Sequence, residues 1–157
     1  MRRSLLSFAS LALVAAPLAA CGPDPLLGTY NYTSTAVTNF TQPTTTSQTN
    51  NGMGTVTVTA GNDYSVDFVA SGETQHCVLT GTRNGSGMIF AAGQSCMFSS
   101  TMNGTQINYT ATLTNGNGVL SGTALTITLA YTFSGNAGAI ALMGTGTLVL
   151  NSTPVSH

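Results

Sequence analysis

The segment of residues 125–133 constrains the fold of this chain more than any other feature of its sequence. Its odd positions hold Leu125, Ile127, Leu129, Tyr131 and Phe133, and its even positions hold Thr126, Thr128, Ala130 and Thr132. This strict alternation predicts a β-strand with one apolar face and one polar face, and it does not fit the period of a helix. The chain must therefore fold so that the apolar face of a sheet is buried.

Similar segments recur along the chain and are separated by Gly and Asn, which predicts a succession of antiparallel strands. The expected strands span residues 27–37, 55–59, 64–70, 74–82, 88–98, 107–114, 125–133 and 139–150. Residues 38–52 are rich in Thr, Gln and Asn, contain Pro43, and are expected to form a long surface loop. We also expect a turn at residues 115–118, Asn-Gly-Asn-Gly, and a bend or bulge near Gly93.

About eight strands with one apolar face must close on themselves or form two packed sheets, because a single open sheet would leave that face in water. Closure also protects strand edges from pairing with other molecules. Charged residues, which could protect the edges instead, make up only 4% of the chain. We therefore expect an all-β antiparallel meander closed as an up-and-down barrel, with a β-sandwich as the alternative.

The charge composition excludes one class of partner. The chain has no Lys, and its basic residues are Arg2, Arg3 and Arg83. If the N-terminal segment is removed, Arg83 stands against four carboxylates, and the net charge of the remainder is −3. Binding to nucleic acid requires several basic side chains, so no nucleic-acid partner is expected. The hydrophobic content of 42% indicates a folded chain, because disordered chains are poor in such residues.

The N-terminal segment has the pattern of an export signal. Arg2 and Arg3 form a positive start, and residues 5–18 form an apolar run that is too short to span a bilayer. The run closes with Leu18-Ala19-Ala20-Cys21, whose cysteine an ordinary signal does not require. A plain signal peptide followed by a chance cysteine is the alternative interpretation.

Leu18-Ala19-Ala20-Cys21 resembles the lipobox of bacterial lipoproteins. This resemblance implies that residues 1–20 are removed and that Cys21 carries a thioether-linked diacylglycerol and an amide-linked acyl chain, which together anchor a protein stably to a membrane. Gly22 follows where the inner-membrane retention signal of the family has Asp, which favours the outer membrane of a Gram-negative bacterium. The whole chain is similar to small Thr/Ser/Gly-rich lipoproteins of such bacteria, a resemblance that implies no specific activity.

The resemblance also sets the expected domain boundaries. Residues 21–26 would form a lipidated tether, stiffened by Pro23 and Pro25. Residues 27–151 would form a single β domain, since this length suits one core. Residues 152–157, which include His157, are expected to form a disordered tail.

Cys77 and Cys96 remain as an even pair once Cys21 is set aside. An exported protein folds in an oxidising compartment, where such pairs form disulfides. A hairpin about the turn Asn84-Gly85-Ser86-Gly87 would bring the two cysteines opposite each other. We therefore expect a disulfide between them.

Asp63, Asp67, Glu73 and His76 form the one cluster of residue types that could bind a metal or move a proton. Asp63 lies in an expected turn and Asp67 on an expected solvent face, and spacing alone supplies no convergent site. His76 and Cys77 are strand neighbours that point to opposite faces, so they cannot ligate one ion together. The sequence also contains no Walker or dinucleotide-binding glycine motif and no nucleophile-elbow sequence. We expect no enzymatic activity, no metal and no cofactor.

Gly28-Thr29-Tyr30 resembles the Gly-X-Trp start of lipocalins, whose barrels carry small apolar ligands, although Tyr stands in place of Trp. We expect a non-catalytic structural or interaction role on the membrane. The alternative is a carrier of a small apolar ligand. The residues that would line such a ligand cavity are Tyr32, Phe68, Leu129, Tyr131 and Phe133. A wide interior would favour the carrier, and a filled core would favour the structural role.

Overall fold

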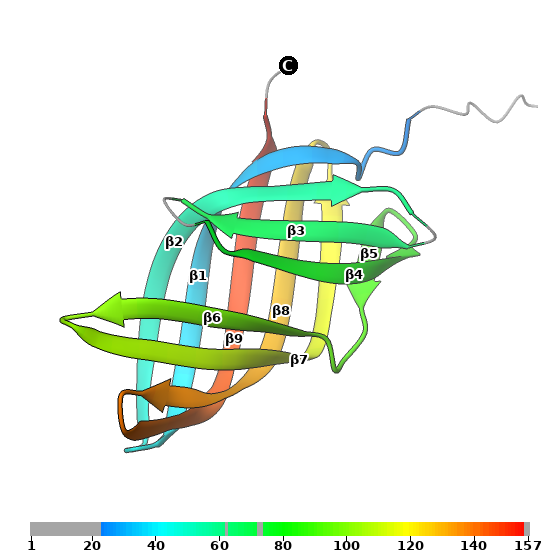
Figure 1. Ribbon diagram of the computed structural model, residues 1–157. Helices are drawn as coiled ribbons and strands as arrows, with labels where there is room; N and C mark the ends of the chain where they lie inside the picture. The colour runs from blue at the N-terminus through cyan, green and yellow to red at the C-terminus, as the bar shows by residue number, and fades with distance from the viewer. Residues whose placement is uncertain (1–22, 62, 72–73, 156–157) are drawn as a thin grey trace, which may run out of the picture.

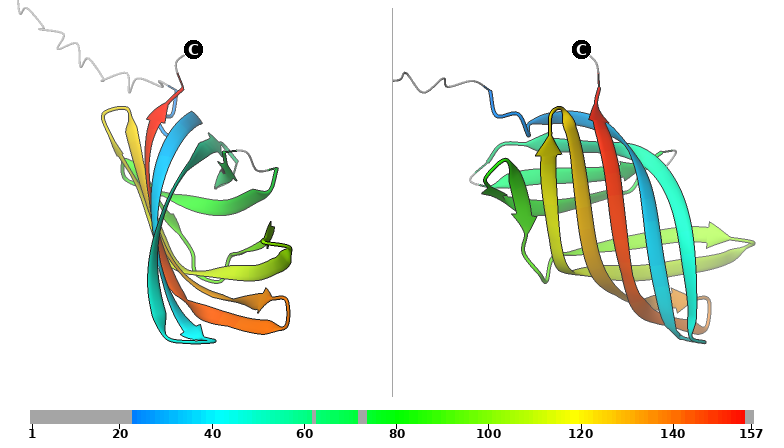
Figure 2. Two further views of the ribbon diagram at one scale, coloured as in Figure 1. Left: turned by 90° about the vertical axis from the view of Figure 1, so that its left-hand side faces the viewer. Right: turned by 180° about the vertical axis from the view of Figure 1, so that it is seen from behind.

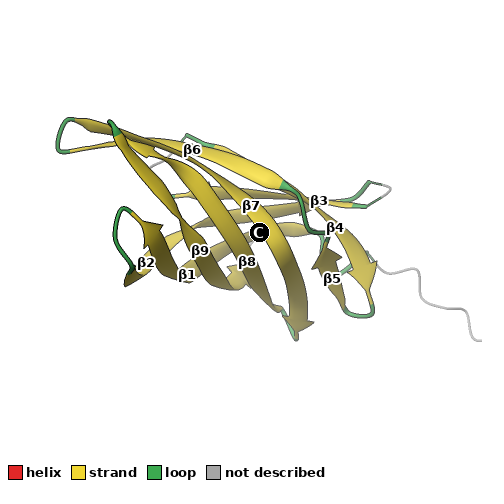
Figure 3. Ribbon diagram, turned by 90° about the horizontal axis from the view of Figure 1, so that it is seen from below, coloured by secondary structure: helices red, strands yellow, loops and turns green. Residues whose placement is uncertain are grey.

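A computed structural model describes residues 23–61, 63–71 and 74–155. Nine strands account for nearly all of them: β1 (Gly28–Gln42), β2 (Thr46–Thr59), β3 (Tyr64–Ala70), β4 (His76–Asn84), β5 (Gly87–Phe90), β6 (Ser95–Met102), β7 (Thr105–Ser121), β8 (Ala124–Ala137) and β9 (Ile140–Pro154) (Figure 1). Seen from below, the described part of the chain consists of strands and connecting loops (Figure 3). The expected all-β antiparallel fold is confirmed.

The strands form a single sheet that closes into a ring. Their order is β5-β4-β3-β2-β1-β9-β8-β7-β6, and β5 also pairs with the second half of β7. The closing ladder runs from Gly87 opposite Val119 to Phe90 opposite Gly116. Seen from behind, β1, β2, β7, β8 and β9 run side by side as one curved wall (Figure 2). β6 is not part of this closing ladder and pairs instead with the first half of β7.

The strand expected over residues 88–98 is two strands, β5 and β6, which is why the sheet has nine strands instead of about eight. The chain turns between them at Gly93, whose φ of 90° lies in the left-handed region that favours glycine. The predicted interruption near Gly93 was therefore right, but its effect was underestimated. The turn separates β6 from β4, so that β6 pairs with the first half of β7 while β5 pairs with β4 and the second half of β7.

The prediction of a loop over residues 38–52 was wrong. β1 continues to Gln42 and β2 begins at Thr46, and the two strands pair from Gly28 opposite Val58 to Phe40 opposite Thr46. Most side chains of β2 before Gly54 are exposed, so this part of the sheet has no apolar period to detect. Threonine is nevertheless a good strand residue, because its branched Cβ suits the pleated backbone.

The prediction of a turn at residues 115–118 was also wrong, because this segment lies within β7 and continues its pairing with β8. A bulge between Leu113 and Asn115 precedes it. Gly116 and Gly118 serve packing here. A Cβ at Gly116 would lie 3.3 Å from the Cβ of Phe90, and one at Gly118 would lie 2.9 Å from Cγ of Met88. These two glycines therefore make room inside the ring for side chains of β5.

The ends of the domain differ from the expected boundaries. β9 extends to Pro154, and the side chain of Ser152 is buried and donates a hydrogen bond to the carbonyl of Leu125. The expected tail over residues 152–157 is therefore ordered strand in its first half. Asp24 and Leu26, assigned to a tether, pack onto the domain, and Leu26 is 0% exposed.

Residues 1–22, which include the signal segment and Cys21, lie outside the described residues, as do Glu73 and His157. In the part of the chain that the structure does describe, no helix is long and apolar enough to cross a membrane.

Candidate ligand cavity

The ring is filled at one end and hollow at the other. The fully buried apolar side chains gather where the N-terminal segment enters: Leu26, Val56, Val58, Val66, Met88, Phe90, Leu125, Ile127 and Leu150. On β1, Tyr30 and Tyr32 are buried, whereas Ala36, Thr38 and Phe40 on the same face are only half-buried. Packing therefore loosens along β1 toward the ends of the β1–β2, β6–β7 and β8–β9 hairpins, at the lower left of Figure 1.

Three pockets with shared walls occupy this hollow half. Their volumes are about 390, 320 and 240 Å³. Tyr109 lines all three, and Tyr131 and Leu129 each line two of them. Small-molecule sites typically have volumes of about 300 to 1,000 Å³, so each of the two larger pockets is large enough for a small ligand.

Five aromatic rings form the centre of the cavity wall. Phe98 and Tyr109 stack with ring centroids 5.0 Å apart. Phe133 lies edge-on to both Tyr109 and Phe40, at 6.2 and 5.3 Å, and its centroid is 6.5 Å from that of Tyr131. These rings come from β1, β6, β7 and β8, so the cavity depends on the tertiary arrangement of strands that are distant in sequence.

Glycines on β9 create the space that two of these rings occupy. Tyr131 pairs with Gly146 and Phe133 with Gly144 across the β8–β9 ladder. A Cβ on either glycine would overlap the opposing ring. The rings therefore lie directly against the bare backbone of β9.

The structure places all five residues expected to line a cavity on these walls. Tyr32 and Phe68 border the 320 Å³ pocket, Leu129 borders that pocket and the 240 Å³ pocket, and Tyr131 and Phe133 border the 390 Å³ pocket. The sequence analysis did not single out the other aromatic residues of the wall, Phe40, Phe98 and Tyr109. Tyr109 alternates with polar residues in the expected strand over 107–114, so its inward direction was visible, but its position beside a void was not.

β4 and β6 border the cavity but form no backbone ladder with each other, and this boundary is called the seam. The Cys77–Cys96 disulfide crosses this seam, with the two Cα atoms 5.4 Å apart, and both cysteines line the 240 Å³ pocket. The expected hairpin is present between β4 and β5, but its ladder ends at Gly81 opposite Phe90. Cys96 therefore reaches Cys77 from β6 and not from the hairpin partner strand.

Two glutamine side chains replace backbone pairing on either side of this disulfide. Gln94 Oε1 accepts a 2.6 Å hydrogen bond from the amide of Thr80, and Gln94 Nε2 donates to the carbonyl of Thr80 at 2.9 Å. Gln75 makes the equivalent contacts with β6: its Oε1 accepts from the amide of Ser99 at 3.2 Å, and its Nε2 donates to the carbonyl of Met97. The seam is thus held by side chains alone.

Charged side chains lie away from the cavity. Among the described residues, no Asp, Glu, His or Arg lines any of the three pockets. The polar lining groups are neutral: Thr38, Gln48 and Asn50 near the open end, Ser100 on β6, Gln75 and Gln94 at the seam, and the hydroxyl groups of the tyrosines. The cavity is therefore suited to an apolar, uncharged occupant.

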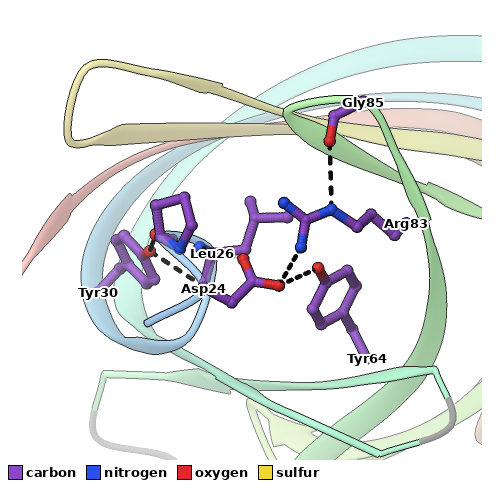
Figure 4. Close-up of polar contacts among 7 residues, drawn as sticks. Asp24, Leu26, Tyr30, Tyr64, Arg83 and Gly85 are labelled. Carbon is purple, nitrogen blue, oxygen red and sulfur yellow. Dashed lines mark hydrogen bonds and ion pairs between the residues drawn. The ribbon is translucent and has the colours of Figure 1, made fainter. Parts of the chain in front are cut away.

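The opposite end of the ring is closed by the N-terminal segment (Figure 4). Asp24 Oδ2 accepts a 2.5 Å hydrogen bond from the hydroxyl of Tyr64 and lies 2.5 Å from Nη1 of Arg83. Asp24 Oδ1 accepts from the amide of Leu26 at 3.0 Å. The hydroxyl of Tyr30 donates to the carbonyl of Leu26 at 3.2 Å. These contacts hold Leu26 in the filled end of the ring.

The same contacts shift two ionisation equilibria. The hydrogen bond from Tyr64 is the main reason why the pKa of Asp24 is lowered; desolvation opposes this shift, and the Leu26 amide and Arg83 lower the pKa further. Burial, followed by the neighbouring carboxylate of Asp24, raises the pKa of the Tyr64 hydroxyl. Asp24 is therefore held as a carboxylate and Tyr64 as a neutral hydrogen-bond donor.

The structure brings together two of the four residues considered as a metal or proton-transfer cluster. His76 Nδ1 lies 2.8 Å from Asp67 Oδ2 on the outer face of the sheet. Asp63 instead accepts a 3.2 Å hydrogen bond from the hydroxyl of Thr82, and Glu73 is outside the described residues. Within the described ranges, no group of three His, Cys, Asp or Glu side chains is arranged to hold a metal.

Comparisons with known proteins include a structural likeness to a protein of unknown function. The sequence matches no protein-family model and no curated protein. A protein of unknown function from Nostoc punctiforme, a member of the family DUF3598, aligns with 82% of this chain and 48% of its own length, at 13% identity and a TM-score of 0.38. The chain thus spans about half the length of that protein, and at this TM-score the likeness carries no argument.

Proposed function

We propose that this protein is a lipid-anchored cell-envelope protein that carries a small apolar molecule in the hollow half of its ring. The proposal rests on three neighbouring pockets that share wall residues and are lined mainly by aromatic and aliphatic side chains. Protein interiors normally pack as densely as organic crystals and leave few voids larger than a water molecule. An apolar void of this size is therefore better explained by an occupant than by inefficient packing.

The contrast between the two halves of the ring supports the carrier. In the filled half the side chains pack tightly, and Val56, Val66 and Ile127 are fully buried. In the hollow half, Ala36, Thr38 and Phe40 on the inward face of β1 are only half-buried. An apolar ligand would supply the missing contacts and would gain about 25 cal/mol for each Å² of apolar surface removed from water.

The proposed anchor would orient the cavity. Cys21 precedes Asp24 by three residues, a length of chain that reaches at most about 11 Å. Asp24 is fixed at the filled end of the ring by Tyr64 and Arg83. With Cys21 lipidated, the filled end would face the membrane and the open end would point away from it. Exchange of the ligand would then occur on the side facing the aqueous compartment.

A structural or interaction role is the second candidate, and one observation favours it. Val78 and Met97, on the strands that flank the seam, are 55% and 75% exposed on the outer face. Exposed apolar side chains of this kind can contribute to a protein interface. Neither candidate involves catalysis.

Binding of an uncharged fluorescent probe tests the carrier. The chain with Cys21→Ser, exported to the periplasm, would be titrated with N-phenylnaphthylamine and examined by native mass spectrometry for a molecule retained from the cell. Ala111 lines the 240 Å³ pocket, and Ala111→Phe should weaken probe binding tenfold or more by filling it. The control is Thr112→Phe, whose side chain belongs to the other face of the same strand.

Saturable binding by the parent chain and by Thr112→Phe, lost in Ala111→Phe, would support the carrier. Absence of probe binding together with an unaccompanied polypeptide mass would contradict it and leave the structural role as the better proposal. Circular dichroism of all three proteins checks that each remains folded.

A further inference from the structure

We infer that the cavity binds an uncharged molecule with an apolar body and a hydrogen-bond-accepting oxygen, and that Tyr109 and Tyr131 recognise this oxygen. The inference rests on the proposed carrier function and specifies its ligand class. It starts from a difference between the five tyrosines of the chain.

Three tyrosines outside the centre of the cavity wall have partners for their hydroxyl groups. Tyr30 donates to the carbonyl of Pro25 at 3.0 Å, Tyr32 to that of Val69 at 3.4 Å, and Tyr64 to Asp24 at 2.5 Å. A buried tyrosine normally has such a partner, because leaving a desolvated hydroxyl unpaired costs free energy. These three hydroxyl groups help to hold the filled end together.

Tyr109 and Tyr131 are different. No hydrogen bond joins either hydroxyl to another described residue, and both rings are half-buried among apolar side chains, although neither hydroxyl oxygen is itself fully buried. Both tyrosines line the 390 and 240 Å³ pockets, and both rings contact Phe133, with centroids 6.2 and 6.5 Å from it. The structure thus provides two unused hydroxyl donors beside one apolar space.

The ionisation of Tyr109 suits it to donate. Burial, reinforced by the nearby Tyr131 hydroxyl, raises the pKa of Tyr109 above its ordinary value of 10.0. The phenol therefore keeps its proton at neutral pH and can donate it in a hydrogen bond to a carbonyl, ester or hydroxyl oxygen of a ligand.

The walls select against a charged ligand. Transfer of an ionised carboxylate into apolar surroundings costs much more than transfer of a neutral oxygen, unless a cation is present to pair with it. Arg83, the one described arginine, is already paired with Asp24 at the opposite end of the ring. An ester, ketone or alcohol therefore fits the cavity better than a fatty-acid anion does.

A matched pair of competitors tests the ligand class. Methyl decanoate and decanoate have the same acyl chain, but at pH 8 only the second is charged. Each would be used to displace N-phenylnaphthylamine, which has no oxygen, from the full chain with Cys21→Ser. We expect methyl decanoate to compete at least tenfold better than decanoate.

Removal of the hydroxyl groups tests the recognition. The double variant Tyr109→Phe/Tyr131→Phe keeps both rings, and we expect it to bind methyl decanoate about fivefold or more weakly while its affinity for the probe is unchanged. The control is Tyr30→Phe, which removes a hydroxyl outside the three pockets and should change neither affinity.

Equal competition by decanoate, failure of methyl decanoate to displace a bound probe, or an unchanged ester affinity in the double variant would each overturn the inference. These outcomes all require that the probe binds. Failure of the probe to bind the parent chain would instead overturn the carrier function itself, so the two failures are distinguishable.

Discussion

The carboxylate of Asp24 lies 2.5 Å from the hydroxyl of Tyr64, and this contact joins the segment before the first strand to the third strand of the sheet (Figure 4). Arg83 on β4 binds the same carboxylate oxygen. Three separate parts of the chain therefore meet at one atom, and Leu26 is buried beside them. Closure of the filled end thus depends on residues that stand between the proposed anchor and the β domain.

We expect loss of this contact to destabilise the domain. Tyr64→Phe removes one hydrogen bond to a charged group and should lower the free energy of unfolding by about 1 to 3 kcal/mol. Urea unfolding followed by circular dichroism measures this change. Asp63→Asn alters an exposed carboxylate that accepts only from Thr82, and it should have an effect of less than about 0.5 kcal/mol. Equal stability of the Tyr64→Phe variant and the parent would show that the N-terminal segment is not held in this way.

The lowered pKa of Asp24 predicts a loss of stability in acid. A carboxylate whose folded pKa lies below its unfolded value, here 3.8, stabilises the fold above that value and ceases to do so as the pH falls through the folded pKa. The contribution of Asp24 should therefore be complete at neutral pH and disappear below about pH 4. Unfolding free energies of the parent and Asp24→Asn, measured from pH 7 to pH 2, should converge in acid. A difference between them that stays constant with pH would contradict the prediction.

Loss of the disulfide should lower stability without removing the sheet. The bond joins residues 19 positions apart, for which the loop-entropy model gives about 3 kcal/mol. The double variant Cys77→Ala/Cys96→Ala should show this decrease in urea unfolding and keep a strand spectrum in circular dichroism. Addition of a reductant should destabilise the parent but not the double variant. A parent that is insensitive to reductant would mean that the bond contributes little.

Gln94 should protect one backbone amide from exchange with solvent. The amide of Thr80 donates to the side chain of Gln94 and not to a neighbouring strand. In Gln94→Ala, hydrogen exchange at Thr80 should accelerate by a factor of ten or more, because its acceptor is gone. Gln106→Ala is the control, since the side chain of Gln106 donates to Oδ1 of Asn108. Protection of Thr80 that is unchanged in Gln94→Ala would indicate that the seam is held in another way.

Gly146 should be intolerant of a side chain. A Cβ there would overlap the ring of Tyr131, so Gly146→Ala must displace that ring from the cavity wall. We expect the substitution to destabilise the domain by about 1 to 3 kcal/mol and to weaken probe binding. Thr147→Ala, on the outward face of the same strand, should leave probe binding unchanged. Equal probe binding by Gly146→Ala and the parent would show that the Tyr131 ring is not part of the binding wall.

Local patterns in the sequence determined the strands and the direction of their side chains. Leu125, Ile127 and Leu129 alternate with polar neighbours and all point into the ring, because a strand presents successive residues on opposite faces. Asn103-Gly104 is a typical two-residue hairpin sequence, and both residues have the positive φ, 50° and 77°, that such a turn requires. The period of two therefore predicts side-chain direction from the sequence alone, whereas turn chemistry does not suffice, because the Asn-Gly-Asn-Gly of residues 115–118 lies within β7.

The tertiary structure decided which inward residues are tightly packed and which border the cavity. Leu125 and Tyr131 have the same pattern in sequence, yet Leu125 is fully buried and Tyr131 lines the hollow half. The difference arises because β5 closes the ring at one end and Leu26 enters there, while β6 stands apart from β4 at the seam. Alternation specifies a direction toward the interior but not how much of the interior the distant strands fill, so the cavity emerged only from the assembled ring.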